Sequence, residues 1–353
     1  MGTLYLDRRG MELRVRDGTI ELRADGERLR SVAARLVERV VMRADTLVGS
    51  ASLAALAELG VGVVALGGRD GTRVAHLLGA PVADARARIA QCMRVGDEAW
   101  ATAWSRRVVG IKLANQRRFL ARALAARPDL RKSLMDALGT LDLAHERLAD
   151  AADRAAVRGH EGGGAAAYFR AYAGLFAPAL GFERRRRRPP PDPVNACLSL
   201  GYTLLHAQAV QACWASGLDP MVGFLHMPVH GRHSLACDLV EPWRAALDEW
   251  VWVQFRERNL RPDQFGGDGA GACVMGKAAR AVFYQSVTPL QKRCGAGMRR
   301  QARLAARVLA GTLALPDAAT EDMDEDEAWQ SGFEAGAAGD SDARPADSHG
   351  ERT

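Results

Sequence analysis

Long apolar runs are absent from this chain of 353 residues. No stretch reaches about 18 uninterrupted apolar residues, the length that a membrane-spanning helix needs. The opening segment MGTLYLDRRG has no apolar core and already carries Asp7, Arg8 and Arg9. We therefore expect neither a signal peptide nor a membrane span.

Paired cysteines are absent as well. The six cysteines are scattered and no C-x-x-C occurs. This spacing argues against both a disulfide framework and a zinc site, and it favours a reducing, cytoplasmic location.

The positive net charge of +6 is unevenly distributed. Residues 316–353 hold twelve acidic residues and two arginines, which leaves a charge of +16 on the rest. A body this basic predicts a polyanionic partner, most commonly nucleic acid. The alternative is a high-GC genome that uses arginine wherever a solvated residue is needed.

Apolar residues first alternate with polar ones and then follow a helical period. The two-residue period of Leu4, Leu6, Leu13 and Val15, with Asp-Gly turn signals, predicts strands. Helical periods follow over residues 134–158, 195–216, 242–256 and 277–310. We predict an α+β protein: a small β-rich domain (1–78), a linker (79–90), a larger all-α catalytic domain (91–315) and a disordered acidic tail (316–353).

Three segments carry candidate chemistry. In the first, Glu161 precedes three glycines, which would let a ligand approach closely. The alternative places Glu161 at a helix N-terminus, where the helix dipole favours a carboxylate. In the second, His226, His230 and His233 fall within eight positions, open to metal or phosphate binding, although single histidines are more often core residues.

The third segment brings two carboxylates together. Asp238 and Glu241 are three residues apart among apolar neighbours, so they share a face if this segment is helical. Desolvating both is costly unless a cation lies between them. The alternative is a pair of helix-start acids with Arg244 as their partner. Together the three segments offer oxygen and nitrogen donors without a thiolate, a set that suits Mg²⁺ or Mn²⁺ better than zinc.

These segments resemble a known family, the CRISPR-associated spacer-acquisition integrase, which is the universal first protein of CRISPR adaptation. The run GHEGGGAAAYF is similar to its Glu-Gly-x-Ala-Ala-x-x-Tyr block, and RRPPPDPVNACLSLGYTLL to its Asp-Pro-x-Asn block. GLDPMVGFLH followed by GRHSLACDLVEPWR is similar to its His and Asp-Leu-x-Glu-Pro-x-Arg blocks. Order and spacing agree over roughly residues 3–310, including Lys112, Asn115 and Gln116.

The resemblance implies a site and a reaction. Glu161, His226 and Glu241 would bind Mg²⁺ or Mn²⁺, with Asp238 as a further catalytic carboxylate. A homodimer would join a small CRISPR-associated partner protein. A short DNA's 3′-hydroxyl would attack a phosphodiester of the repeat array during antiviral defence, and endonuclease cleavage is the hydrolytic variant. DNA contacts are expected for Tyr168, Arg184, Arg185, Arg186, Arg187, Arg188, Asn195 and Arg244.

The sequence leaves two other functions open. A non-catalytic DNA-binding scaffold would use the same basic surface, with structural carboxylates. A repair or transposon-linked nuclease would use the same fold without a repeat array. Metal-dependent strand cleavage separates the first alternative, and a neighbouring repeat array separates the second.

Overall fold

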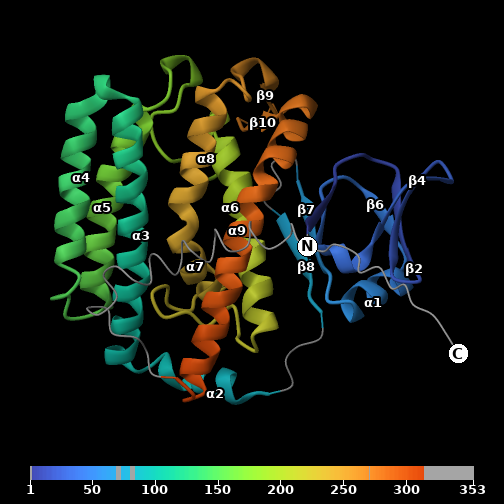
Figure 1. Cartoon of the computed structure of the whole chain (residues 1–353), viewed down its shortest axis with the longest axis horizontal. Coiled ribbons are helices and arrows are strands. Elements are labelled where there is room, and N and C mark those ends of the chain that lie inside the picture. Colours follow the sequence, from blue (N-terminus) through green and yellow to red (C-terminus); the bar gives the residue numbers. More distant parts are fainter. Residues whose placement is uncertain (1, 69–72, 80–83, 270, 314–353) are drawn as a thin grey trace, which may run out of the picture. The chain divides into compact units, whose positions relative to one another are not determined.

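The structure, a computed structural model, describes residues 2–68, 73–79, 84–269 and 271–313. The acidic tail predicted at residues 316–353 lies outside this range. The described residues form a strand-rich N-terminal region followed by a mostly helical region (Figure 1). Within the described part of the chain, no helix combines the length and apolar character that crossing a bilayer requires.

Two four-stranded sheets make up the N-terminal region. One has the order β1-β5-β7-β8, with β8 antiparallel and the other neighbours parallel; the second has the order β4-β3-β2-β6, with only β2 and β6 parallel. Asp17 and Gly18, and likewise Asp25 and Gly26, have positive φ, as the tight hairpin turns predicted from the Asp-Gly pairs require. The strands are β1 (Gly2–Leu6), β2 (Met11–Arg16), β3 (Thr19–Ala24), β4 (Glu27–Ala33), β5 (Val37–Met42), β6 (Thr46–Val48), β7 (Gly62–Gly67) and β8 (Arg73–Leu77), with η1 (Ala34–Leu36) before β5 and α1 (Ser50–Glu58) after β6.

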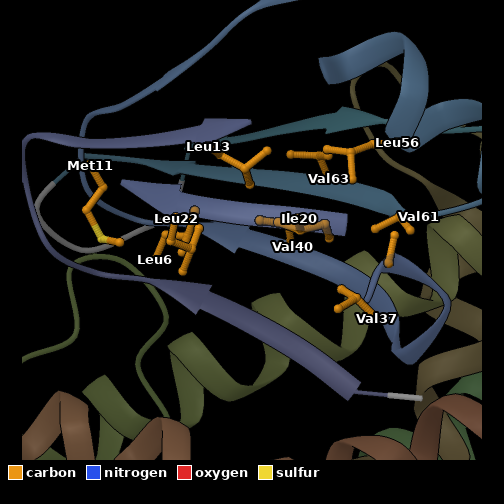
Figure 2. Close-up of a cluster of buried hydrophobic side chains, with 11 residues drawn as sticks. Leu6, Met11, Leu13, Ile20, Leu22, Val37, Val40, Leu56, Val61 and Val63 are labelled. Carbon is orange, nitrogen blue, oxygen red and sulfur yellow. The ribbon is translucent and has the colours of Figure 1, made fainter. Parts of the chain in front are cut away.

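The apolar alternation of these strands forms a common core. Leu13 on β2, Ile20 on β3, Val40 on β5 and Leu56 on α1 are all essentially unexposed and belong to one buried cluster. Figure 2 shows these side chains pointing toward one another between the strands. The strands predicted from this alternation are confirmed.

Long helices dominate the rest. The helices α3, α4 and α5 pack side by side, and α6 packs on α7, α8 and α9 (Figure 1). Aspartates cap three of them: Asp97, Asp153 and Asp192 each accept a backbone N–H at the start of α3, α5 and α6. The helices are α2 (Arg86–Arg94), α3 (Glu98–Ala126), α4 (Arg131–Glu146), α5 (Arg154–Gly174), α6 (Pro193–Ala215), α7 (Ser234–Val240), α8 (Arg244–Arg256) and α9 (Lys277–Leu309), with short η2 (Pro128–Leu130), η3 (Pro178–Leu180), η4 (Glu241–Trp243) and η5 (Pro262–Gln264).

The all-α description of the helical region is wrong in one respect. A two-stranded antiparallel hairpin, β9 (Phe265–Gly267) with β10 (Cys273–Met275), lies between α8 and α9. Three-residue strands are too short to show a period in the sequence. The helix predicted over 134–158 is also interrupted, since α4 ends at Glu146 and α5 begins at Arg154.

Polar contacts join the strands to the helices. Arg39 on β5 donates from Nε to Gln211 Oε1 on α6 at 2.9 Å. Tyr5 on β1 stacks on Tyr284 of α9 with ring centroids 4.4 Å apart. The described residues accordingly all belong to one compact unit. The division into domains at residues 78–90 stays a prediction.

We predict that Gly297→Ala lowers the free energy of unfolding by about 1–3 kcal/mol. A Cβ at this position of α9 would lie 2.0 Å from Trp243 Cζ2. The indole cannot swing away freely, because it is buried and its Nε1 donates to Gln301 at 3.0 Å. Urea denaturation checks this.

Gly139→Ala on α4 is the matched control. A Cβ there meets nothing within 4 Å, so the better helix propensity of alanine should stabilise the protein by up to about 1 kcal/mol. Equal stability of wild type and Gly297→Ala would contradict the close packing of α9 on η4.

Candidate active site

The predicted metal ligands come from three separate parts of the helical region. Glu161 lies on α5, His226 on the loop before α7, and Glu241 begins η4. Asp153 caps α5, so Glu161 lies about two turns inside the helix. The interpretation of Glu161 as a helix N-terminal acid is therefore wrong, and its carboxylate needs another source of stabilisation.

Of the three glycines after Glu161, Gly164 allows neighbouring helices to approach closely, whereas a Cβ on Gly162 or Gly163 would meet nothing within 4 Å. A Cβ on Gly164 would lie 2.9 Å from Leu113 Cδ2 on α3 and 3.4 Å from Leu141 Cδ2 on α4. A larger residue at 164 would push α5 away from α3. The glycine thus serves helix packing, which sets the distance between Glu161 on α5 and the side chains of α3.

The His226 loop is held against α7 by Asp238. The buried carboxylate of Asp238 accepts the backbone N–H groups of Phe224, Leu225 and His226 at 2.8, 3.0 and 3.0 Å. A Cβ on Gly223 would lie 2.6–2.8 Å from backbone atoms of this turn and of α7. The loop conformation therefore depends on one carboxylate and one glycine.

Asp238 also orients the imidazole of His226. Its Oδ1 lies 2.7 Å from Nδ1 of the ring, while Nε2 is 4.0 Å from Glu241 Oε1. A carboxylate on one ring nitrogen fixes the tautomer in which the other nitrogen carries a free lone pair. Asp238 is thereby placed behind His226 as a support.

Glu241 and Glu161 share a cation supplied by α3. Lys112 Nζ donates to Glu161 Oε1 and lies 2.6 Å from Glu241 Oε2. Arg244 Nε donates to the other oxygen of Glu241 at 2.8 Å. Two carboxylates and two cations therefore meet where α3, α5, η4 and α8 converge.

These pairings decide the ionisation of the site. Burial alone would raise the pKa of Glu241, but Arg244 and Lys112 outweigh burial and hold it below its usual range. Burial likewise opposes the charge of Lys112, whereas Glu241 and Glu161 raise its pKa. Glu241 remains an anion and Lys112 a cation at neutral pH.

The cluster has the donor atoms of a metal site, but the ammonium of Lys112 lies between its two carboxylates. Among the residues that the structure describes, no three histidine, cysteine, aspartate or glutamate side chains form a group that could hold a metal ion as they stand. Glu241 Oε2 is nevertheless buried without a hydrogen-bond partner of good geometry. Two carboxylates and an imidazole suit a hard divalent cation, so these residues fit such an ion once the ammonium moves.

Behind Arg244 lies a buried network of tyrosines. The guanidinium of Arg244 lies 4.7 Å from the ring centroid of Tyr202, whose hydroxyl donates to Asp248 Oδ1. Tyr168 donates to the other Asp248 oxygen at 2.9 Å, and Tyr172 donates to the Asp248 carbonyl at 2.8 Å. Burial raises the pKa of Asp248 to about 6 despite these donors.

Two of the side chains predicted to contact DNA are fully buried. Tyr168 and Asn195 are both 0% exposed. The amide of Asn195 bonds Asp192, the Arg184 carbonyl and the Arg185 guanidinium. Both side chains support the site from within and do not present a surface to DNA.

The loop of five arginines, Arg184–Arg188, contains one inward-facing arginine and four exposed ones. Arg185 turns inward, donating to Asn195 Oδ1 at 2.9 Å and lying 5.5 Å from the Tyr202 ring, on the ring that Arg244 also contacts. Arg185, one of the predicted DNA contacts, is therefore only partly exposed and is held by the protein itself. The exposed members are Arg184, Arg186, Arg187 and Arg188.

Comparison with known proteins decides the family. The family model described as "CRISPR associated protein Cas1" matches residues 4–288. A relative from Thermodesulfovibrio yellowstonii, named CRISPR-associated endonuclease Cas1 1, is 31% identical over 292 residues, covering 80% of this chain and 89% of its own. The chain belongs to the Cas1 family.

Solved structures agree on the fold. A casposase bound to its integration product has a TM-score of 0.75 at 18% identity, covering 95% of this chain and all of its own. A chain of a Cas6-RT-Cas1–Cas2 complex has a TM-score of 0.73 at 19% identity, covering 88% of this chain and 35% of its own. The order of a strand-rich region and a helical region is thus shared across this fold.

Two parts of this Cas1 site had no signal of their own in the sequence. The sequence marks Lys112 only as part of the family pattern, and it gives no sign of Asp248. Asp248 lies 80 residues from Tyr168 and 46 from Tyr202 along the chain. Such partners meet only in the folded protein, so no local motif could reveal them.

We predict that Asp238→Ala lowers the free energy of unfolding by about 3 kcal/mol or more, because three buried backbone donors lose their acceptor. His226→Ala, which truncates a half-exposed side chain on the same loop, should cost at most about 1 kcal/mol. Urea denaturation of both variants checks this. Equal costs would contradict the role of Asp238 in holding the loop.

Asp248 should make stability depend on pH. Its pKa of about 6 in the folded protein is above the unfolded value of about 3.9. The stabilisation from its protonated form is therefore complete below about pH 4 and is lost as the pH rises through 6, a change on the order of 3 kcal/mol. Asp248→Asn cannot ionise and should lack this loss. Denaturation from pH 4 to 8 checks it; parallel curves for both proteins would contradict the shift.

Proposed function

We propose that this chain is a divalent-metal-dependent DNA endonuclease and integrase that inserts short foreign DNA into a CRISPR repeat array. The observation that carries the proposal is the convergence of Glu161, His226 and Glu241 on one position, within a chain of the Cas1 family. Carboxylate and imidazole donors at one place suit chemistry on a phosphodiester. The sequence motifs and the geometry support the same three residues independently.

Each residue has a role in this proposal. Glu161, His226 and Glu241 would hold Mg²⁺ or Mn²⁺, which when bound stabilises the charge that develops on the attacked phosphate. Asp238 keeps Nε2 of His226 available by occupying Nδ1. Arg244 balances the charge of buried Glu241 and keeps its carboxylate oriented.

The exposed arginines of the 184–188 loop would bind the DNA backbone. In this proposal their guanidinium groups hold phosphates, which fixes the position of the DNA without reading its sequence. Because Arg185 lies against Tyr202, and Tyr202 against Arg244, the loop is anchored directly beside the site. The incoming duplex and the repeat array would therefore be held near the three ligands.

The same proposal includes the assembly. A homodimer with a small CRISPR-associated partner protein, acting in the cytoplasm, would present two such sites to the array. A fold neighbour from a Cas6-RT-Cas1–Cas2 complex supports the partner. The casposase neighbour, bound to its integration product, supports joining over hydrolysis alone.

We predict that Glu161→Ala lowers Mg²⁺- or Mn²⁺-dependent DNA cleavage and joining by roughly a hundredfold or more, since loss of even a supporting partner of a metal ligand costs 10–100-fold. The fold should persist, because the Glu161 side chain is 26% exposed. Glu146→Ala, an exposed acid at the end of α4, is the matched control and should be fully active. Wild-type rates in Glu161→Ala would refute the site and leave a DNA-binding scaffold.

Joining should depend on the DNA end. A 3′-hydroxyl has to be positioned at the phosphate, whereas water does not. A duplex ending in dideoxynucleotides should lose joining into a supercoiled, repeat-bearing plasmid, with the partner protein present, while nicking continues. Joined product from blocked DNA, or none from unblocked DNA, would exclude the integrase and leave a plain nuclease.

A further inference from the structure

Lysine is rare in this protein. The chain has four lysines and 44 arginines. Lys132, Lys277 and Lys292 are exposed, whereas Lys112 is 6% exposed and lies at the centre of the carboxylate cluster. A cation buried at such a place in an arginine-rich chain calls for a reason specific to lysine.

The contacts of Lys112 define what it does. Its ammonium donates to Glu161 on α5 and lies 2.6 Å from Glu241 on η4, so one cation neutralises two of the three proposed metal ligands. Glu241 Oε2 receives no well-directed hydrogen bond in return. The ammonium thus acts as a charge between the carboxylates and only partly as a hydrogen-bond donor.

We propose that Lys112 is an internal competitor for the metal, an inference that rests on the proposed function. In the metal-free protein its ammonium neutralises Glu161 and Glu241, and binding of a divalent ion requires it to leave them. Both cations would use the same two carboxylates, and their mutual repulsion is strong in a buried site. The measured metal affinity is therefore lower than the three ligands alone would provide.

The chemistry of lysine suits this role better than that of arginine. A planar guanidinium grips a carboxylate through two fixed hydrogen bonds, as Arg122 does with Glu249. An ammonium is a compact charge on a flexible four-carbon stem and can withdraw. Because the coupling between two ligands is reciprocal, metal should weaken the hold of the site on Lys112 as much as Lys112 weakens that on metal.

The first test is Lys112→Met, which keeps the stem length and removes the charge. Mn²⁺ affinity, measured from the free-ion electron paramagnetic resonance signal without DNA, should rise by about tenfold, within the range usual for coupled ligands. Lys132→Met makes the same change at an exposed position of α4 and should leave the affinity unchanged. The melting temperature without metal should fall in Lys112→Met and be restored by Mn²⁺.

The outcomes separate this inference from the proposed function. Equal or weaker Mn²⁺ binding by Lys112→Met, with wild type binding one ion that Glu161→Ala loses, would overturn the competition and leave the metal site intact. Mn²⁺ binding by neither protein would overturn the metal site, and with it this inference.

A second test needs no variant. Reductive methylation with formaldehyde and cyanoborohydride, read by mass spectrometry, labels accessible lysine amines. Lys112 should be protected in the metal-free wild type and become labelled with Mn²⁺, while Lys132, Lys277 and Lys292 serve as internal controls of constant labelling. Protection of Lys112 that is the same with and without bound Mn²⁺ would overturn the proposal.

Discussion

Two buried or half-buried carboxylates that share one cation form the constraint on which this site depends. Glu161 and Glu241 lie close enough for a single ammonium to contact both. Like charges at such a separation repel strongly once water is removed, so the arrangement persists only with positive charge beside it. The protein supplies that charge through Lys112 and Arg244. In the proposed function, a metal ion replaces the charge of Lys112.

The fold brings the carboxylates together by close backbone packing. Gly164 lets α5 approach α3, Gly223 lets the His226 loop approach α7, and Gly297 lets α9 approach the indole of Trp243 next to Glu241. Asn115 on α3 adds a direct hold on η4, donating to the Pro242 carbonyl at 2.9 Å. The active-site geometry is therefore a product of packing between helices, with Asp238 fixing the one loop that contributes a ligand.

Much of the fold could be predicted from the sequence because its signals are local. The period of Leu13 and Val15 and the Asp-Gly turns identified strands, and the helices at 193–215 and 277–309 match their predicted limits closely. Strands β4 to β6 and β8 escaped prediction; β4 is largely exposed and β6 has three residues, so neither shows a clear period. The resemblance to the family pattern supplied the three predicted metal ligands, Glu161, His226 and Glu241.

The predictions that failed concern the surroundings of individual side chains in the folded protein. The Glu161-Gly-Gly-Gly run suggested a helix start, yet α5 begins at Arg154 and continues through the run, where Gly164 packs against α3 and α4. The Glu-Gly-x-Ala-Ala-x-x-Tyr block includes Tyr168, but it does not show that the hydroxyl of this tyrosine donates to buried Asp248. Lys112 and Glu161 are 49 residues apart, and their pairing follows from the packing of α3 on α5.

The most direct test of the central claim is a crystal structure of the protein with Mn²⁺, with anomalous differences recorded at the manganese absorption edge. The account predicts one strong anomalous peak coordinated by Glu161, His226 and Glu241, at a distance of about 2.0–2.3 Å from their oxygen and nitrogen atoms, with Lys112 withdrawn from both carboxylates. Mn²⁺ bound elsewhere, with Lys112 still bridging Glu161 and Glu241, would contradict it.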